Sequence, residues 1–474
     1  MVSDIINLFL PVLCLLFAIF AQTVFSLLKS PKLAFKYKNV NIMTANLVSI
    51  IGILAAIVAQ MLSPKDYIGF YNSVAMTHSS CYLSVLSLLV GLSTVFLARN
   101  LLGDNRQNCY KYHILLLTAL IGAMCVLMSN DFLTLFVALE TLSFSLYFLI
   151  AFAKGYSSKE ASFKYLIVNA VSVMFFLFGV SYLLGITSSL NFAEITQVLS
   201  NDHNAVIYTV AGIMIFAGLA MKLAIFPFAN WVLDVYSGTD TATLNFLSTV
   251  PKIAVLGLLF RLLTSVLGYS FELNVVILLL AILSAFWANI YALKECNVKR
   301  LMACSSSANA AYMLIVMAIV SQINSAAVLF YLICYTFMNI GVFAYLNSIE
   351  PNIKNYDVDK LPKSKGVFSV VAFLVCVIGL AGLPITSGFV AKIYLLYALV
   401  ESGLLFIPLI LLLIILFSIA LCYYIKLARS VINKFEEEPL LKTPSVILQI
   451  AAVITVLLGI LPFDLIVRCV NVFA

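Results

Sequence analysis

The sequence predicts an all-α polytopic membrane protein, on the evidence of its composition and its recurring apolar windows. Hydrophobic residues make up 64% of the chain and charged residues only 10%. Soluble globular domains carry about 25% charged residues, so a soluble protein is excluded. Windows of about 20 apolar residues, each sufficient to cross a hydrocarbon core of about 30 Å, recur along the whole chain.

We count fourteen such windows, and we expect each to be one transmembrane span. They begin near Ile5, Ile42, Cys81, Tyr112, Asp131, Phe163, Ala205, Thr241, Val275, Leu301, Ala326, Val367, Leu404 and Val446. The first window has neither a basic leading region nor a small-residue cleavage site, so we interpret it as a retained span. The linker from 187 to 204 is acidic and polar, and we expect it to be an outward loop.

Loop charge predicts the orientation, because basic residues accumulate on the cytoplasmic side of membrane proteins. Of the 27 basic residues, three lie inside spans, and Lys65, Arg261 and Arg468 face outward if the N-terminus is outside. All the others fall in the inward loops after spans 1, 3, 5, 9, 11 and 13. The net charge of +7 is then explained by topology and anionic inner-leaflet lipid, and it needs no nucleic acid.

Three lysines lie inside apolar spans: Lys222, Lys252 and Lys392. An ammonium at membrane depth costs about 2.5 to 3.5 kcal/mol on insertion scales, so such residues face a bundle interior or a hydrated cavity. We interpret them as residues that bind and release protons during transport. Glu140 is the acidic residue nearest the middle of a span. It is either a neutral structural carboxyl or, as we favour, a proton-active group that is paired with a buried base.

Lys164 lies near the expected start of span 6 and has two interpretations. Its ammonium extends to the membrane surface, as lysines near span ends do, or it is a second partner for Glu140. A carboxylate that chooses between two lysines would act as a switch.

Two spans are interrupted, and the interruptions suggest an internal repeat. Span 7 breaks at Pro227, because proline lacks the backbone N–H and clashes with the preceding turn. Span 12 breaks in GLAGLPITSG, at Gly382 and Pro384. Freed backbone groups are tolerated in a membrane only inside protein or beside water. Because the two broken spans lie five apart, an odd number, the copies would be inverted, as in many transporters.

The predicted organisation is therefore one membrane domain with four parts. Residues 1–111 hold the first three spans, 112–266 one five-helix repeat, 267–430 its inverted copy, and 431–474 the last span.

The remaining reactive residues give no sign of a cofactor site. The ten cysteines are scattered singly without a C-x-x-C pair, which favours a structural role over a zinc or iron–sulfur site. His78, His113 and His203 lie in loops or at span ends, where we expect them to be solvated. The sequence has no Gly-rich nucleotide loop, so energy for transport must come from partners.

Several stretches resemble the antiporter-like membrane subunits of respiratory complex I, and within that family the subunit N branch, whose mitochondrial counterpart is subunit 2. The resemblance extends from Asp131 to Tyr397. It is carried by EASFKYLIVNA (160–170), MKLAIFPFANWVLDVY (221–236), NVKRLMACSSS (297–307), AVLFYLICYTFMNIGVFAYL (327–346) and LAGLPITSGFVAKIYLL (380–396).

The resemblance implies roles for the buried charges. Glu140 and Lys222 would form the central pair, Lys252 the relay, and Lys392 the terminal lysine toward the outer face, with Lys164 as a modulator. The chain departs from the family pattern at Asn230 and Asn309, where relatives carry or often carry histidine, and near Asp240, where a proline is usual. Asn cannot take a proton at neutral pH, so a histidine relay at these positions is not expected.

The resemblance also implies partners, cofactors and a location. The chain would move protons without redox chemistry of its own, beside other membrane subunits and a peripheral redox arm, with flavin, iron–sulfur clusters and quinone in those partner subunits. A bacterial inner membrane is expected, with the mitochondrial inner membrane as the alternative. Two other functions stay open: a subunit of a multi-subunit cation/proton antiporter, and a non-pumping structural subunit.

Overall fold

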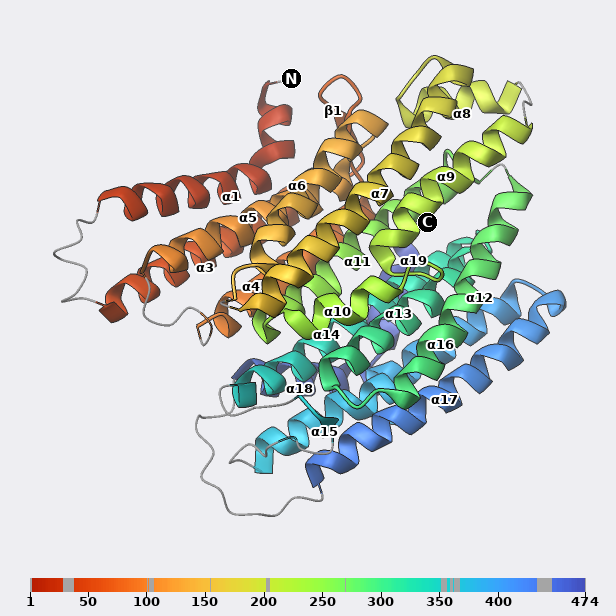
Figure 1. Ribbon diagram of the computed structural model, residues 1–474. Coiled ribbons are helices and arrows are strands. Elements are labelled where there is room, and N and C mark those ends of the chain that lie inside the picture. The colour runs from red at the N-terminus through yellow and green to blue at the C-terminus, as the bar shows by residue number, and fades with distance from the viewer. Residues whose placement is uncertain are drawn as a thin grey trace. The chain divides into compact units, whose positions relative to one another are not determined.

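The computed structural model is helical almost throughout (Figure 1). It describes residues 2–28, 38–99, 101, 106–153, 155–201, 205–268, 270–350, 356–358, 361, 367–432 and 446–473. His203, which was expected in a loop, lies outside these residues. The chain divides into two compact units, 1–211 with 238–266 and 212–237 with 267–474. Helix α9 (Ala205–Leu223) begins in the first unit and ends in the second.

The first unit contains one short β-hairpin and a bundle of helices. Its helices are α1 (Val2–Leu28), α3 (Lys38–Leu62), α4 (His78–Leu97), α5 (Arg106–Met128), α6 (Phe132–Ile150), α7 (Tyr156–Thr187), α8 (Phe192–Asn201) and α11 (Thr241–Thr264). The hairpin pairs β1 (Tyr67–Gly69) with β2 (Val74–Met76) in antiparallel register, Ile68 opposite Ala75.

Helix α11 is the centre of the first unit. Nearly all its side chains are buried, and it packs on α4, α5 and α6. At its C-terminal end Arg261 donates to the carbonyls of Leu127 and Ser129, at 3.1 and 2.6 Å. These are carbonyls that the end of α5 would otherwise leave without partners. The guanidinium therefore fixes the ends of α5 and α11 to each other.

The second unit is built around α13 and α14. Its helices are α10 (Asn230–Gly238), α12 (Phe271–Lys294), α13 (Val298–Met317), α14 (Gln322–Ile349), α15 (Val367–Ala381), α16 (Ser387–Glu401), α17 (Ile407–Ile432), α18 (Val446–Ile460) and α19 (Phe463–Asn471), with a 3-10 turn at Leu404–Phe406. Every side chain of α13 is buried except that of Arg300, and most of α14 is buried too.

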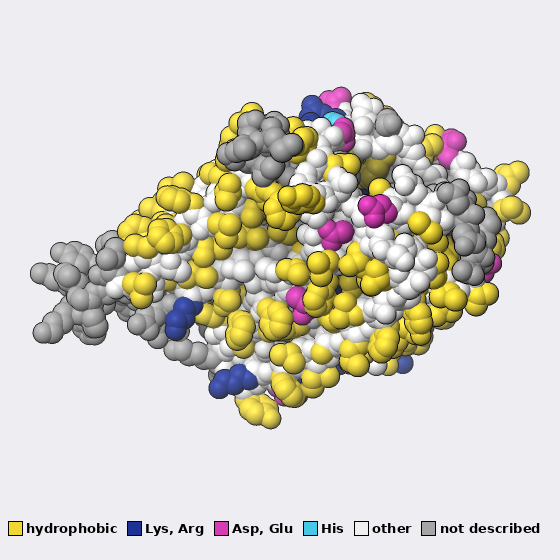
Figure 2. All heavy atoms as spheres, turned by 90° about the horizontal axis from the view of Figure 1, so that it is seen from above, with side chains coloured by type: hydrophobic (Ala, Val, Ile, Leu, Met, Phe, Trp, Pro, Cys, Tyr) yellow, Lys and Arg dark blue, Asp and Glu magenta, His cyan; other side chains and the backbone are white. Residues whose placement is uncertain are grey.

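The structure confirms an all-helical polytopic membrane protein. Among the described residues, eleven helices are long and apolar enough to cross a membrane, or twelve if the bent pair α18 and α19 counts as one span. Hydrophobic side chains are spread over the face shown in Figure 2, and charged ones there are few and scattered. Such a surface is typical of a protein in a lipid bilayer, because apolar side chains can face the hydrocarbon without a free-energy cost.

Three local expectations differ from the structure. The linker expected as an outward loop contains α8, whose Phe192, Ile195 and Leu199 are buried at helical spacing. Helix α7 begins at Tyr156, seven residues before the expected start of its span at Phe163. Hydropathy did not predict this helical start, because the first residues of the helix, YSSKEAS, are polar and hydropathy detects only its apolar part.

The third difference concerns His113, which was expected to be solvated at a span end. The structure shows that this was wrong, because His113 has no exposed surface. Helix α5 starts at Arg106, so His113 lies two turns inside the helix, which packs on α1, α3, α4, α6 and α11. The apolar window that was used to place the span begins at Tyr112 and missed the first two turns.

Candidate functional site

The first interrupted helix breaks between Leu223 and Asn230, with Pro227 exposed in the gap. Lys222 is half-buried in the last turn of α9, where the carbonyl end of the helix dipole favours a cation. The indole N–H of Trp231 donates to the carbonyl of Met221 at 3.2 Å. A side chain from α10, the second half of the broken helix, thus donates a hydrogen bond to a carbonyl in the last turn of α9, the first half.

The second interrupted helix breaks between α15 and α16, which end at Ala381 and begin at Ser387. Gly382 has φ +80°, a conformation that favours glycine. Lys392 extends back from α16 and donates from Nζ to the carbonyls of Leu380 and Ala381, at 3.1 and 2.7 Å. Its Nζ also lies 4.8 Å from the centre of the Phe417 ring, a cation–π contact.

Glycines make this second break possible. A Cβ on Gly382 would lie 2.6 Å from Cδ of Lys392, and one on Gly388 would lie 1.9 Å from the carbonyl oxygen of Gly379. A Cβ on Gly459, from α18, would lie 2.3 Å from the carbonyl oxygen of Ile385. Three backbone segments therefore meet closely around the lysine, and Lys392 is only 6% exposed.

Lys252 lies on the unbroken helix α11 and is 3% exposed. Pro251 precedes it and has no N–H to give to the preceding turn. Polar side chains continue along the helix before it: Thr243, Asn245, Ser248 and Thr249 are all buried. The surroundings of this lysine are thus richer in hydrogen-bonding groups than the apolar sequence around it indicates.

Glu140 is half-buried on α6, next to an amide from α7. Asn169 donates from Nδ2 to Oε1 of Glu140 at 3.2 Å, and Ser143 donates to Oδ1 of Asn169 at 3.3 Å. A neutral partner of this kind satisfies a carboxylate without neutralising its charge. Lys164 is ion-paired with Glu160 on its own helix at 2.9 Å, and both side chains are more than 40% exposed.

The predicted charges fall in both units. Glu140, Lys164 and Lys252 belong to the first unit, and Lys222 and Lys392 to the second. Asn230 is exposed at the start of α10, and Asn309 is buried in the middle of α13. The continuous line of charges stays a prediction.

The structure adds a buried polar network around Asn309 that the sequence did not indicate. Tyr331 donates to Oδ1 of Asn309 at 2.6 Å, and Nδ2 of Asn309 donates to the carbonyl of Ser305 at 2.7 Å. The hydroxyl of Tyr424 bonds Ser305 and lies 3.4 Å from Nδ2 of Asn309.

A second set of hydroxyl contacts is centred on Ser306, the residue after Ser305. The hydroxyl of Ser306 bonds Tyr335 and Tyr236, each at 3.2 Å. Hydroxyls from α10, α14 and α17 thus meet on one side of α13. Each of these hydroxyls can both donate and accept a hydrogen bond.

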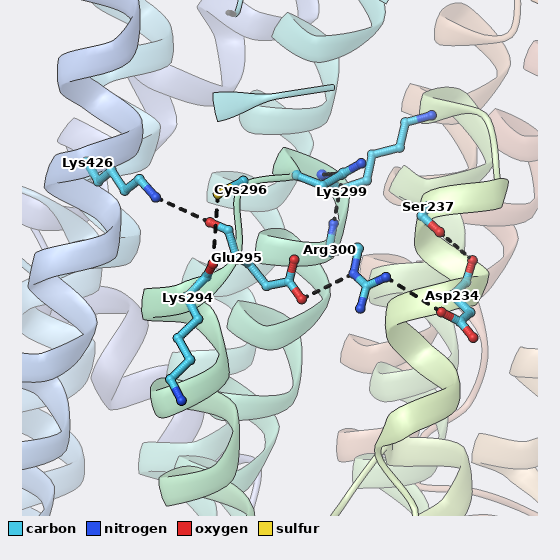
Figure 3. A network of polar contacts seen from close by, with 9 residues as sticks. Asp234, Ser237, Lys294, Glu295, Cys296, Lys299, Arg300 and Lys426 are labelled. Carbon is cyan, nitrogen blue, oxygen red and sulfur yellow. Dashed lines mark hydrogen bonds and ion pairs between the residues drawn. The ribbon is translucent and has the colours of Figure 1, made fainter. Parts of the chain in front are cut away.

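A charged network lies at the start of α13 (Figure 3). Arg300 pairs with Glu295 at 3.2 Å and with Asp234 of α10 at 3.8 Å. Lys426 of α17 donates to the backbone carbonyl of Glu295 at 3.4 Å. The network joins the helix after the first break to the turn between α12 and α13.

A second ion pair lies beside this network. Lys299 is buried, pairs with Glu350 at 3.2 Å and lies 3.9 Å from the centre of the Tyr356 ring. Among the described residues, no three His, Cys, Asp or Glu side chains are grouped as metal ligands would be.

Comparison with known proteins identifies the family. The profile of the NADH:quinone oxidoreductase/Mrp antiporter transmembrane family matches residues 129–418. NADH-quinone oxidoreductase subunit N 1 of Koribacter versatilis is 32% identical over 427 residues, which cover 86% of this chain and 82% of the relative. Subunit N of Anoxybacillus flavithermus is 35% identical over 322 residues, 64% of each chain.

Solved structures share the fold. A chain of respiratory complex I from Thermus thermophilus with bound aureothin is 26% identical, with a TM-score of 0.80 over 96% of this chain and 98% of that one. A chain of the Mrp complex from a Dietzia species has a TM-score of 0.83 at 18% identity, over 100% of this chain and 97% of that one, and shows the fold alone. The chain belongs to the NADH:quinone oxidoreductase/Mrp antiporter transmembrane family.

Proposed function

We propose that this chain is the subunit N type of proton-translocating membrane subunit in an NADH:quinone oxidoreductase. The observation that carries the proposal is the buried ammonium of Lys392, held on the carbonyls of a broken helix. A cation costs too much at this depth to be retained for packing alone. The names of the relatives and the complex I structure, at 26% identity, support the same assignment.

The proposed route follows the buried charges. A proton held between Glu140 and Lys222 passes to Lys252 and then, by water and hydroxyl groups, to Lys392 and outward. Moving Glu140 toward or away from Lys222 changes how readily that lysine holds its proton, and Lys164 modulates this step. Transfer of one charge against the membrane potential costs about 2.3 kcal/mol per 100 mV, so the chain needs an external energy source.

We propose that Asn230 and Asn309 act by hydrogen bonding to water and to hydroxyls rather than by carrying protons. The buried contacts of Asn309 with Tyr331 and Ser305 support this role. Neither amide takes a proton at neutral pH.

Fourteen spans and an inverted repeat are part of the same proposal. The spans that hydropathy finds omit α13, a 20-residue helix that is rich in small polar residues, and the broken pair α15 and α16, of 15 residues each. Counting both, with the bent pair at the C-terminus, supports fourteen. Helices α5 and α11, predicted spans 4 and 8, run parallel as that count requires, because Tyr112 meets Thr243 and a Cβ on Gly257 would meet Leu127.

The proposed partners are the other membrane subunits of the complex and, indirectly, a peripheral arm. Flavin, iron–sulfur clusters and quinone would belong to those partners, and this chain would do no redox chemistry. The proposed location is a bacterial inner membrane.

The test uses the whole complex, purified in mild detergent and reconstituted in vesicles. Co-purification of redox subunits, identified by mass spectrometry, is expected. Proton translocation that is driven by NADH oxidation should fall sharply in Lys252→Met and stay unchanged in Lys294→Met, which removes an exposed lysine. Equal pumping in both variants would overturn the proposal and favour a structural subunit.

A cation/proton antiporter subunit is the second candidate, because the Mrp complex shares the fold over the whole chain. It predicts co-purification with small antiporter subunits instead of redox subunits. It also predicts that transport responds to Na⁺ and proceeds without NADH.

A further inference from the structure

His113 is a buried titratable side chain that the proposed route does not use. It is 0% exposed, and among the described residues neither of its ring nitrogens has a hydrogen-bonding partner. A neutral imidazole has one donor and one acceptor nitrogen. Leaving such groups unsatisfied costs about 1 to 3 kcal/mol each, so this position calls for a ligand that can hydrogen-bond to both.

A second unsatisfied polar atom lies at the same level of the bundle. Asn245 of α11 donates from Nδ2 to Ser93 and Thr94 of α4, at 2.9 Å each. Its Oδ1 is buried and has no partner among the described residues. The amide is therefore held in place by α4 while its oxygen is left to accept from something else.

The register of the helices brings the two positions to one level. The hydroxyls of Tyr112 and Thr243 lie 3.2 Å apart, so His113 of α5 is level with the turn of α11 that contains Asn245. On α4, a Cβ at Gly91 would touch Leu120, two turns beyond His113 on the same face of α5. Because α4 runs opposite to α5, His113 faces the end of α4 that carries Ser93 and Thr94.

The same face of α11 leads from this level to Lys252. Asn245, Ser248 or Thr249, and Lys252 are spaced i, i+3 or i+4, and i+7, so they lie on one side of the helix. At a rise of 1.5 Å per residue, Asn245 and Lys252 are about 10 Å apart along the axis. Two or three water molecules cover that distance.

We propose that His113 and Asn245 hold ordered water and form a proton-entry site that supplies Lys252. His113 accepts a proton at one ring nitrogen and gives up the proton of the other nitrogen to water on the Lys252 side. A change of tautomer then resets it, and no bond other than those to the proton is made or broken. The inference rests on the proposed proton translocation and adds to it a titratable residue and an entrance.

The entrance is the N-terminal end of α11. Asp240 caps that end by accepting from the N–H of Thr243 at 2.8 Å, and it is 6% exposed. On the loop-charge topology, this end faces the inner side, from which protons are taken up. Ionisable groups on the helices that form the site include Asp240 and Lys252 on α11, Lys111 and Tyr112 on α5, and Arg99 just beyond α4.

The test measures the reconstituted complex, with His113→Gln and His113→Leu against His78→Gln. His78 is 40% exposed and pairs with Asp66 at the surface, so it is a matched control. We expect both His113 variants to lower the rate of NADH-driven proton translocation by about a hundredfold, the lower end of what positioned proton-transfer groups contribute. The solvent deuterium isotope effect on that rate should rise, because proton uptake becomes rate-limiting.

Two results would overturn the inference. The first is a His113→Gln variant that pumps like the unaltered complex while Lys252→Met does not, which would leave the proposed function intact. The second is a high-resolution map of the complex that shows no water between His113 and Asn245. That measurement decides the question even if the His113 variants fail to assemble. A Lys252→Met complex that pumps normally would instead count against the proposed function itself.

Discussion

The two broken helices, α9 with α10 and α15 with α16, bond carbonyls at their breaks with different donors. Both breaks free backbone carbonyls that a continuous helix would have bonded internally. After α9, the carbonyl of Met221 accepts from the backbone N–H of Ala224 and from the neutral indole N–H of Trp231, each at 3.2 Å. After α15, the ammonium of Lys392 takes the carbonyls of Leu380 and Ala381. The indole N–H at the first break keeps its proton at neutral pH, whereas the ammonium at the second break can lose one.

This difference gives the two breaks different consequences for transport. The indole N–H of Trp231 keeps its proton, so we expect the first break to be a fixed support that does not change during transport. At the second break, loss of a proton from Lys392 weakens the hydrogen bonds that hold α16 to the end of α15, since charged donors bond about twice as strongly as neutral ones. The protonation of Lys392 and the geometry of the break are therefore coupled.

The largest effect is expected for Lys392→Met. The variant keeps most of the side-chain volume but leaves two carbonyls without their donor, at a cost of about 1 to 3 kcal/mol each. It also removes the side chain that we propose carries the proton. We expect loss of NADH-driven proton translocation, measured with a pH-sensitive dye in vesicles, together with a lower thermal midpoint of the purified complex.

Lys392→Arg separates the two losses in that variant. Arginine keeps the charge and the donors but does not deprotonate in proteins. We expect the thermal midpoint to recover and the pumping to remain absent. Recovered pumping would contradict the coupling of proton release to the break.

Gly382→Ala should have the next largest effect, because the new Cβ would lie 2.6 Å from Cδ and 2.9 Å from Nζ of Lys392. Alanine at positive φ also costs about 1 to 2 kcal/mol. Gly403→Ala is the matched control, since Gly403 has φ +123° but open space around its Cβ position. The pumping rate should fall in Gly382→Ala and stay near normal in Gly403→Ala. A fall of the same size in both variants would show that backbone strain, rather than displacement of Lys392, lowers the pumping rate.

The sequence indicated the fold and the interruptions better than the contacts around them. Apolar windows and the Pro and Gly residues near 227 and 382 were enough to predict membrane helices and to suggest where two of them are interrupted. The carbonyls that bind Lys392 could not be predicted, because they depend on how α16 folds back on α15. His113 was misplaced, since hydropathy marks where a helix becomes apolar and not where it begins.

The network around Asn309 lay outside sequence reasoning for a different reason. Tyrosines are common in membrane helices, and Tyr331 and Tyr424 have no distinctive spacing from Asn309 in the sequence. They meet it only because α13, α14 and α17 pack together. In the sequence, only the position of Asn309 close to three consecutive serines, 305 to 307, indicates a polar face on this helix. It does not indicate which residues of other helices bond to that face.

Trp231→Phe tests the fixed support at the first break. Phenylalanine keeps an aromatic ring but removes the N–H that bonds the carbonyl of Met221, and the loss should cost about 0.5 to 1.5 kcal/mol. We expect a small drop in the thermal midpoint with pumping retained. A loss of pumping as large as that of Lys392→Met would mean that the two breaks do not differ in the way described.

The smallest effect is expected for Arg300→Gln, which loosens the link between α10 and the turn before α13. Arg300 pairs with Asp234 at 3.8 Å and with Glu295 at 3.2 Å, and it is 36% exposed. Ion pairs with this exposure contribute about 0 to 1 kcal/mol, so the thermal midpoint should change little and less at high salt. Because α10 follows the first break, a pumping defect in this variant, with an unchanged midpoint, would show that the first break moves during transport. Normal pumping would agree with a rigid first break, and it would favour Lys392 as the residue at which we propose that proton release changes the geometry of a helix.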